Sequence, residues 1–209
     1  MSGARDRILA RRLIAIVRLD DAAWALPAAE ALIAGGVDIL ELTLTTPGAL
    51  TCLRQLATRY GERILLGAGT VLDVAQAEAA LDAGARFLVS PALHLPMIAR
   101  AHRRGALALP GALTPTEIVT AWEHGADFVK VFPCDAVGGA AYLKAIRGLL
   151  PHIPLVPTGG VTLETAGGLL AAGAVALGAG SALLSAADCA AGAWDRVQHR
   201  AAQWVAATR

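Results

Sequence analysis

Short apolar stretches alternate along the chain with longer alanine-rich stretches, and a glycine precedes most of the apolar ones. These glycines are Gly36, Gly61, Gly84, Gly105, Gly125, Gly148 and Gly173, and the differences between their successive numbers are 25, 23, 21, 20, 23 and 25. A spacing of this size is the length of one compact unit of strand, loop, helix and loop, with the glycine ending the helix. The pattern therefore predicts a fold built from a repeated strand–helix unit.

The apolar stretches are predicted to be strands and the alanine-rich stretches helices. Each apolar stretch is short and nearly continuous, which is typical of strands that are buried on both faces. The predicted strands are residues 13–17, 37–40, 64–66, 87–89, 107–109, 128–129, 153–156 and 175–177. The clearest helices are predicted at residues 22–34, 74–83 and 116–124.

Eight strands joined by helices favour an α/β fold, a closed (β/α)8 barrel of parallel strands, preceded by a short N-terminal helix within residues 1–12. No linker, low-complexity segment or change of composition divides the chain, so residues 1–209 are expected to form a single domain. An open doubly wound sheet has the same alternation of strands and helices. The pattern alone does not distinguish the two folds.

Composition and charge narrow the classes of function. Of the 209 residues 56% are hydrophobic and 17% are charged, which is enough apolar material for a sizeable core. The net charge is +1 and no long run of Lys or Arg occurs, so we expect a small-molecule partner and no nucleic acid. Cys52, Cys134 and Cys189 are widely spaced and lie outside any Cys-x-x-Cys pattern, as expected for reduced thiols. Residues 1–12 lack a signal-peptide pattern, and a cytoplasmic protein is expected.

One segment has the length and the lack of charge of a membrane-spanning helix. Residues 169–187 contain no charged side chain. Gly173, Gly178 and Gly180 divide this segment, and much of the remainder is alanine. The segment is therefore predicted to hold a helix end, a short strand and a new helix start, and no membrane contact is expected.

Lys130 is the first candidate for chemistry. In a barrel of this class the active groups lie at the carboxyl ends of the strands, and Lys130 lies within the apolar run 127–132. Burial penalises the ammonium form of a lysine and makes its amine a nucleophile for imine formation. The structural alternative is a lysine whose head group reaches water or pairs with a carboxylate. Lys144, the second of the two lysines, is expected on an exposed helix face.

Glu41 is the second candidate, because it interrupts an apolar strand. Alternation along a strand places Glu41 on the same face as Ile39 and Thr43. A carboxylate on the inner face either transfers protons, as imine chemistry requires, or pairs with a buried cation. An ion pair with Arg18 is the structural alternative, and the two roles are compatible.

Glycines follow the third, seventh and eighth predicted strands. Gly159-Gly160 and the stretch 178–181 lie where barrels commonly bind phosphate, since small residues let backbone N–H groups approach its oxygens. Such glycines also serve ordinary turns. Residues 67–70 lack the spacing of a nucleotide-binding loop and are interpreted as a tight turn that presents Thr70.

Metal catalysis is not expected, and neither is another cofactor. The histidines are scattered, mostly in predicted helices or loops away from the strand ends, at His94, His102, His124, His152 and His199.

Taken together, the stretches at the strand ends resemble the 2-keto-3-deoxy-6-phosphogluconate (KDPG) and 4-hydroxy-2-oxoglutarate (KHG) aldolases, a family of class I lyases of the Entner–Doudoroff pathway. The resemblance extends from Ile14 to Ser181, and the matching stretches are 15–18, 41–47, 67–72, 89–91, 110–111, 130–133, 157–161 and 178–181. It implies reversible cleavage of KDPG to pyruvate and glyceraldehyde 3-phosphate, and of KHG to pyruvate and glyoxylate. It also implies a homotrimer.

The resemblance further implies a role for each candidate residue. Lys130 forms the imine with the keto carbon, and Glu41 is the general acid and base. The implied substrate-binding residues are Arg18 and Thr70 for the carboxylate, Pro91 and Phe132 as pocket walls, Thr158 for a substrate hydroxyl, and Gly159, Gly160, Gly180 and Ser181 for the phosphate.

One position departs from the family pattern. Some members carry an arginine four residues after the catalytic glutamate, where this chain has Thr45. The galactonate epimer of KDPG is therefore an alternative substrate, as is an unphosphorylated one. Two further alternatives are a phosphate-binding isomerase in which Lys130 only supplies charge, and a binding barrel without catalysis.

Overall fold

The structure is a computed structural model that describes residues 2–209. Its strands are β1 Leu13–Val17, β2 Ile39–Thr43, β3 Leu65–Gly69, β4 Phe87–Val89, β5 Leu107–Leu109, β6 Gly111–Ala112, β7 Val129–Val131, β8 Leu155–Pro157 and β9 Leu177–Ala179. Its α-helices are α1 Ser2–Arg11, α2 Ala22–Ala34, α3 Ala49–Tyr60, α4 Val74–Asp82, α5 Leu95–Arg103, α6 Pro115–Glu123, α7 Ala140–Leu149, α8 Leu163–Ala171, α9 Ala186–Ala190 and α10 Trp194–Thr208. Two 3₁₀ turns, η1 Gly61–Arg63 and η2 Asp135–Val137, complete the described elements. Met1, which the predicted domain and N-terminal helix include, lies outside the described residues.

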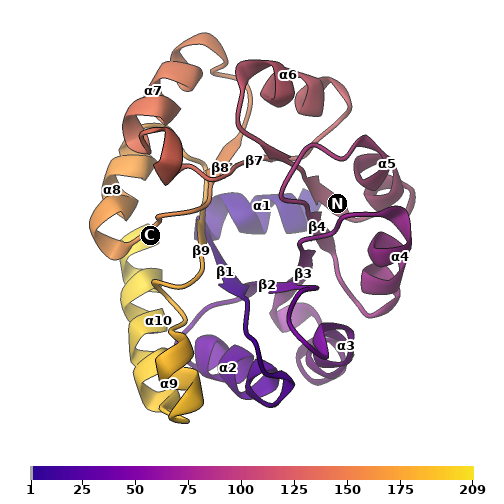
Figure 1. Ribbon diagram of the computed structural model, residues 1–209, viewed down its shortest axis with the longest axis vertical. Coiled ribbons are helices and arrows are strands. Elements are labelled where there is room, and N and C mark those ends of the chain that lie inside the picture. The colour runs from indigo at the N-terminus through magenta and orange to yellow at the C-terminus, as the bar shows by residue number, and fades with distance from the viewer. Residues whose placement is uncertain (1) are drawn as a thin grey trace.

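The strands form two parallel sheets, a six-stranded one in the order β5-β4-β3-β2-β1-β9 and a three-stranded one in the order β6-β7-β8. Within each sheet the strands that follow one another along the chain are neighbours, except where β9 pairs with β1. Figure 1 shows the strands arranged around the centre of the molecule with the helices outside them, and α1 behind the strands in this view. The fold is therefore an α/β fold with a curved parallel sheet covered by helices.

The two sheets contact each other at two places. Pro110 separates β5 from β6, and its carbonyl accepts a hydrogen bond of 2.9 Å from the Lys130 amide. On the other side, the Thr158–Gly178 bridge connects the residue after β8 to β9, and the Val175 amide donates to the Leu155 carbonyl at 3.0 Å. The fifth predicted strand, 107–109, is β5, and β6 lies beyond it; proline has no amide hydrogen to donate, which explains why Pro110 separates the two strands.

A strand occurs at each of the eight predicted positions, but several begin later than predicted. Val37 still donates its amide to the Leu32 carbonyl, which belongs to the turn that ends α2, and β2 begins only at Ile39. The interpretation of residues 67–70 as a tight turn is wrong, because β3 extends through Gly69. These glycines belong to a strand that passes close to its neighbours: a Cβ at Gly67 would lie 2.2 Å from the Phe87 ring.

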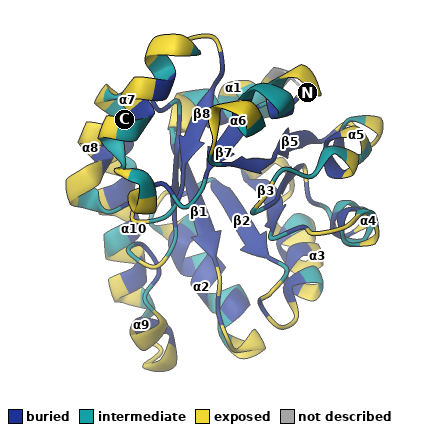
Figure 2. Ribbon diagram, turned by 45° about the horizontal axis from the view of Figure 1, so that its top comes forward, coloured by how far each residue is buried: buried dark blue, intermediate teal, exposed yellow. Residues whose placement is uncertain are grey.

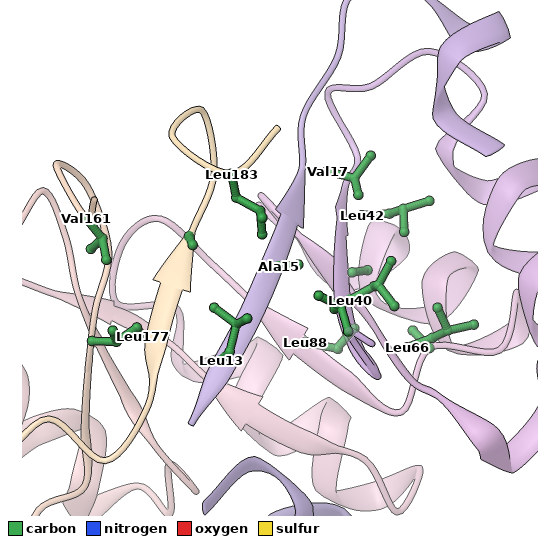
Figure 3. Packing of buried hydrophobic residues seen from close by; sticks show 14 of the residues in the cluster. Leu13, Ala15, Val17, Leu40, Leu42, Leu66, Leu88, Val161, Leu177 and Leu183 are labelled. Carbon is green, nitrogen blue, oxygen red and sulfur yellow. The ribbon is translucent and has the colours of Figure 1, made fainter. Parts of the chain in front are cut away.

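Side chains point alternately to the two faces of each strand, and this creates two hydrophobic clusters. The outer cluster fills the space between strands and helices, and Figure 3 shows Leu13, Ala15 and Val17 of β1 beside Leu40 and Leu42 of β2. In Figure 2 the strands are buried while the outward faces of the helices are exposed. The inner cluster consists of Ile8 of α1 with Ile14, Ile39, Leu65, Phe87, Val89, Leu107, Leu109, Phe128, Val156 and Ala176. Most of its members stand before the last residue of their strands, although Val89 and Leu109 are the last residues of β4 and β5.

Residues 169–187 hold the end of α8, strand β9 and the start of α9, as predicted. Among residues 2–209, no helix combines the length and the hydropathy needed to cross a bilayer.

Candidate active site

A cavity of about 620 Å³ lies at the carboxyl ends of the strands, above the inner hydrophobic cluster. All eleven residues predicted to form the site line this one cavity: Arg18, Glu41, Thr70, Pro91, Lys130, Phe132, Thr158, Gly159, Gly160, Gly180 and Ser181. A neighbouring depression of about 540 Å³ near the start of α3 is lined by residues 44–51, Ala75, Gln76 and Ala79, and holds no ionisable side chain. Of these two cavities, the first is the one lined by groups able to transfer protons or attack a carbonyl.

Lys130 projects into the cavity because successive side chains of β7 point to opposite faces of the sheet. Phe128, two residues earlier, packs in the inner cluster, and Phe132, two residues later, lines the cavity. The Lys130 residue is 7% exposed, and its Nζ lies 4.8 Å from the centre of the Phe132 ring. None of the nine ion pairs among the described residues includes Lys130, so the alternative of a lysine paired with a carboxylate is wrong. Lys144 is exposed on α7, as predicted.

Glu41 follows the same rule on β2, with Ile39 in the inner cluster and Thr43 in the cavity. Glu41 is 3% exposed, and burial raises the pKa of its carboxyl, while the charges of Lys130 and then Arg18 act in the opposite direction. No ion pair within 4.0 Å joins Glu41 to either cation, and Arg18 is exposed at the mouth of the cavity. The ion pair between Glu41 and Arg18, given above as the structural alternative, is therefore absent. A buried carboxyl whose pKa is raised can hold a proton and donate it within the cavity.

Two features of β3 make room for Glu41 and present Thr70. Gly69 faces Glu41 so closely that no side chain fits between them. Thr70 follows directly with φ of 57°, one of two described residues other than glycine with positive φ. This conformation is costly for a β-branched residue, and such strain is concentrated at functional sites.

Threonine hydroxyls at the end of β2 and just after it hold the backbone around Arg18, a role that was not predicted from the sequence. Thr46 is 2% exposed; its Oγ1 accepts from the Leu19 amide at 3.1 Å and donates to the Val17 carbonyl at 3.4 Å. Thr43 Oγ1 lies 3.0 Å from Thr45 Oγ1 and 3.1 Å from Thr46 Oγ1. The peptide groups on both sides of Arg18 are thus fixed. From the sequence, Thr43 was placed on the face of Glu41 and Thr45 was noted as a departure from the family pattern, but no role was assigned to Thr46.

The two glycine stretches adjoin each other across the cavity wall. Gly159 and Gly160 have φ of 92° and 62°, and a Cβ at Gly160 would lie 2.3 Å from Cβ of Asp135 in η2. A Cβ at Gly178 would lie 2.3 Å from Oγ1 of Thr158. A side chain at Gly160 or Gly178 would collide with Asp135 or Thr158, so glycine backbone lines this side of the cavity and forms its glycine wall.

The remaining candidates for metal or thiol chemistry lie elsewhere. All three cysteines are buried, and burial raises the pKa of Cys52 and of Cys134 to about 11, which keeps both thiols protonated. His102 bonds Asp127 at 3.0 Å, and His94 accepts from the Met97 amide to cap α5. Within residues 2–209, no three His, Cys, Asp or Glu side chains gather in a group able to hold a metal ion.

A buried lysine and a buried carboxyl in one cavity at the ends of parallel strands are the features of lysine-dependent aldolases. The family model described as KDPG and KHG aldolase matches residues 5–200, so the chain belongs to the KDPG/KHG aldolase family.

Individual relatives agree with this assignment. The 2-dehydro-3-deoxy-phosphogluconate aldolase of Pseudomonas aeruginosa is 38% identical over 187 residues, which is 90% of this chain and 84% of the relative. A KDPG aldolase from Legionella pneumophila, solved with pyruvate captured at low pH as a covalent carbinolamine intermediate, superposes with a TM-score of 0.87 at 30% identity, covering 95% of this chain and 96% of that one. A native structure described as KDPGal gives a TM-score of 0.86 at 36% identity and covers 93% of each chain.

Proposed function

We propose that this protein is a class I aldolase that reversibly cleaves KDPG to pyruvate and glyceraldehyde 3-phosphate, and KHG to pyruvate and glyoxylate. The observation that carries the proposal is Lys130, which is 7% exposed and lies in a cavity that also contains the buried carboxyl of Glu41. Lys130 forms no ion pair with a carboxylate of residues 2–209. The family assignment and the carbinolamine described for the Legionella relative support the same chemistry.

In the proposed reaction the amine of Lys130 attacks the keto carbon, and loss of water gives a cationic imine. Glu41 exchanges the protons: it protonates the departing hydroxyl, and as carboxylate it removes the proton of the C4 hydroxyl. The C3–C4 bond then breaks, its electron pair flows into the imine, and the aldehyde leaves. Protonation of the resulting enamine and hydrolysis release pyruvate and restore the free amine.

The other lining residues are proposed to bind the substrate. Arg18 supplies the positive charge for the carboxylate, and Thr70 adds a hydroxyl and a backbone donor close by. Pro91 and Phe132 form apolar walls, and the Thr158 hydroxyl bonds a hydroxyl of the substrate. The phosphate is proposed to accept hydrogen bonds from backbone N–H groups of Gly159, Gly160, Gly180 and Ser181.

For the fold we propose that the two sheets close into one eight-stranded (β/α)8 barrel, with β5 and β6 as one interrupted strand, in a single domain over residues 1–209. The hydrogen bonds from β5 and Pro110 to the β7 region and from β8 to β9 support closure. The helices lie outside the strands, whereas a doubly wound sheet has helices on both faces (Figure 1). The homotrimer and the cytoplasmic location stay predictions.

The galactonate epimer is a second candidate substrate. The observation that favours it is the KDPGal structure at 36% identity, together with Thr45 in place of the arginine of some family members. Measuring kcat/KM for both epimers decides between them.

The test of the proposed function is pyruvate release from KDPG by the wild type and by K130A and K130R, in an assay coupled to lactate dehydrogenase. We expect both variants to lose turnover, because neither alanine nor arginine forms an imine. K144A, which changes the exposed lysine of α7, is the matched control and should retain wild-type turnover. Appreciable activity in K130R would instead favour a reaction in which Lys130 supplies only charge.

A further inference from the structure

The segment from Gly180 to Ala186 forms one wall of the cavity without being a helix or strand along most of its length. It lies between β9 and α9, and Gly180, Ser181, Ala182, Leu184 and Ala186 line the cavity. Its own hydrogen bonds are local: the amides of Leu183 and Leu184 both donate to the Gly180 carbonyl, at 2.9 and 2.8 Å. Affinity for an anion depends on backbone donors held at fixed positions, so something must hold this segment.

Arg200 of α10 contacts the segment at two points. Its Nη1 donates to the Leu183 carbonyl at 3.2 Å, and its Nη2 donates to Oδ2 of Asp188 at 2.7 Å. Asp188 is 4% exposed, and its amide donates to the Ser185 hydroxyl that caps α9. Hydrogen bonding to Arg200 lowers the pKa of the Asp188 carboxyl, which stays ionised. One guanidinium thus joins the turn after β9 to the start of α9.

The helix that carries Arg200 is itself firmly packed. Val197, Ala201 and Trp204 of α10 are all fully buried. A Cβ at Gly35 would lie 2.5 Å from Cβ of Ala201, so α10 contacts the end of α2 without intervening side chains. Arg200 therefore links the cavity wall to a fixed part of the core, and not to another loop.

We propose that Arg200 is a positioning residue for the end of the substrate that carries the phosphate: it holds residues 180–188 so that their backbone donors meet that group. This inference rests on the proposed function. Arg200 itself does not line the cavity and acts only through the segment it holds.

A neighbouring arginine provides a matched control. Arg196 lies one turn earlier on α10, and its Nε is 3.4 Å from Oδ1 of the same Asp188. Its side chain is 72% exposed, against 25% for Arg200, and its interactions do not include the Leu183 carbonyl. R196A therefore removes a charge near Asp188 while leaving the held turn intact.

The experiment compares wild type, R200A, R200K and R196A on two ligands. The first readout is the KM for KDPG; the second is the pyruvate concentration that gives half-maximal inactivation with sodium borohydride, since pyruvate has no phosphate. For R200A we expect KM to rise about tenfold or more, given the strength of hydrogen bonds to charged groups, with the pyruvate value within about twofold of wild type. The KM of R200K for KDPG should lie between those of the wild type and R200A. R196A should match the wild type in both readouts.

Different results would overturn the role of Arg200 and the proposed function. An R200A variant whose KM for KDPG stays at the wild-type value, or whose KDPG and pyruvate values rise together, would overturn the inference alone. If R200A does not fold, as judged by circular dichroism and thermal unfolding, R200K carries the same test on the same two readouts. A wild-type protein that releases no pyruvate from KDPG would overturn the proposed function, and the inference with it.

Discussion

The carboxyl of Glu41 lies directly against Gly69 on the neighbouring strand: a Cβ at residue 69 would be 1.9 Å from Glu41 Oε1. The contact involves the whole end of the side chain, since the same Cβ would be 2.6 Å from Glu41 Cδ. The position of the carboxyl in the cavity therefore depends on the absence of a side chain on β3.

Gly69→Ala should displace Glu41 and impair proton transfer while the fold persists. General acid–base catalysis contributes about 10²–10⁴-fold, so we expect kcat to fall by about 100-fold or more. Gly168→Ala is the control: Gly168 lies within α8 and a Cβ there meets nothing within 4 Å. A G69A variant with wild-type kcat and wild-type thermal stability would show that the Glu41 carboxyl does not need its present position.

Glu41→Gln should remove a pH dependence of stability that the wild type has. Burial raises the pKa of Glu41 in the folded state, so the folded wild type holds a proton that the unfolded chain has released, and the wild type loses stability as pH rises through this window. Glutamine does not ionise, so its burial contributes no pH-dependent loss of stability. The unfolding free energy of E41Q minus that of wild type should grow with pH, by up to about 1.4 kcal/mol per unit, and then level off.

Urea unfolding between pH 4.5 and pH 8.5 measures this difference, with Glu123→Gln on the exposed end of α6 as the control for loss of a carboxyl. A difference that shrinks as pH rises would mean that Glu41 is stabilised as a carboxylate, against the burial described above.

Gly160→Ala should weaken binding of the phosphorylated substrate. Gly160 has φ of 62°, and a Cβ there would lie 2.3 Å from Cβ of Asp135, so the alanine must push the glycine wall away from η2. Gly105, with φ of 69° and nothing within 4 Å of a Cβ, carries the same backbone strain at the end of α5, far from the cavity lining. We expect the KM of G160A for KDPG to be at least about tenfold higher than the KM of G105A. Equal KM values in the two variants would remove residue 160 from the phosphate site.

Periodicity was sufficient to predict the order of most elements, because most strands are apolar stretches that follow a glycine at or near the end of a helix. The glycine does not always end the helix, since Gly148 lies within α7. Periodicity was insufficient for glycine, because the same residue type occurs in turns and at close contacts between strands. Glycine at 67 and 69 was interpreted as a turn, whereas both residues lie in β3 and make space for Phe87 and Glu41. A close approach between strands depends on partners distant in sequence, which local pattern does not reveal.

The candidate site was predictable to the extent that residues stand at strand ends. Lys130 and Glu41 are polar residues inside apolar strands, and the structure brings both into one cavity. The supporting residues carry no such signal: Thr46 follows a strand among other threonines, and Arg200 is one of two arginines on α10. Their contacts with Leu19 and Leu183 exist only in the folded chain.

The most direct test of the account is covalent trapping with pyruvate. The protein is incubated with pyruvate and sodium borohydride, its intact mass is measured, and the modified peptide is mapped. The account predicts one adduct per chain, on Lys130, and none in K130A. No adduct, or an adduct on Lys144, would contradict it, because imine formation at Lys130 is the step on which every assigned role depends.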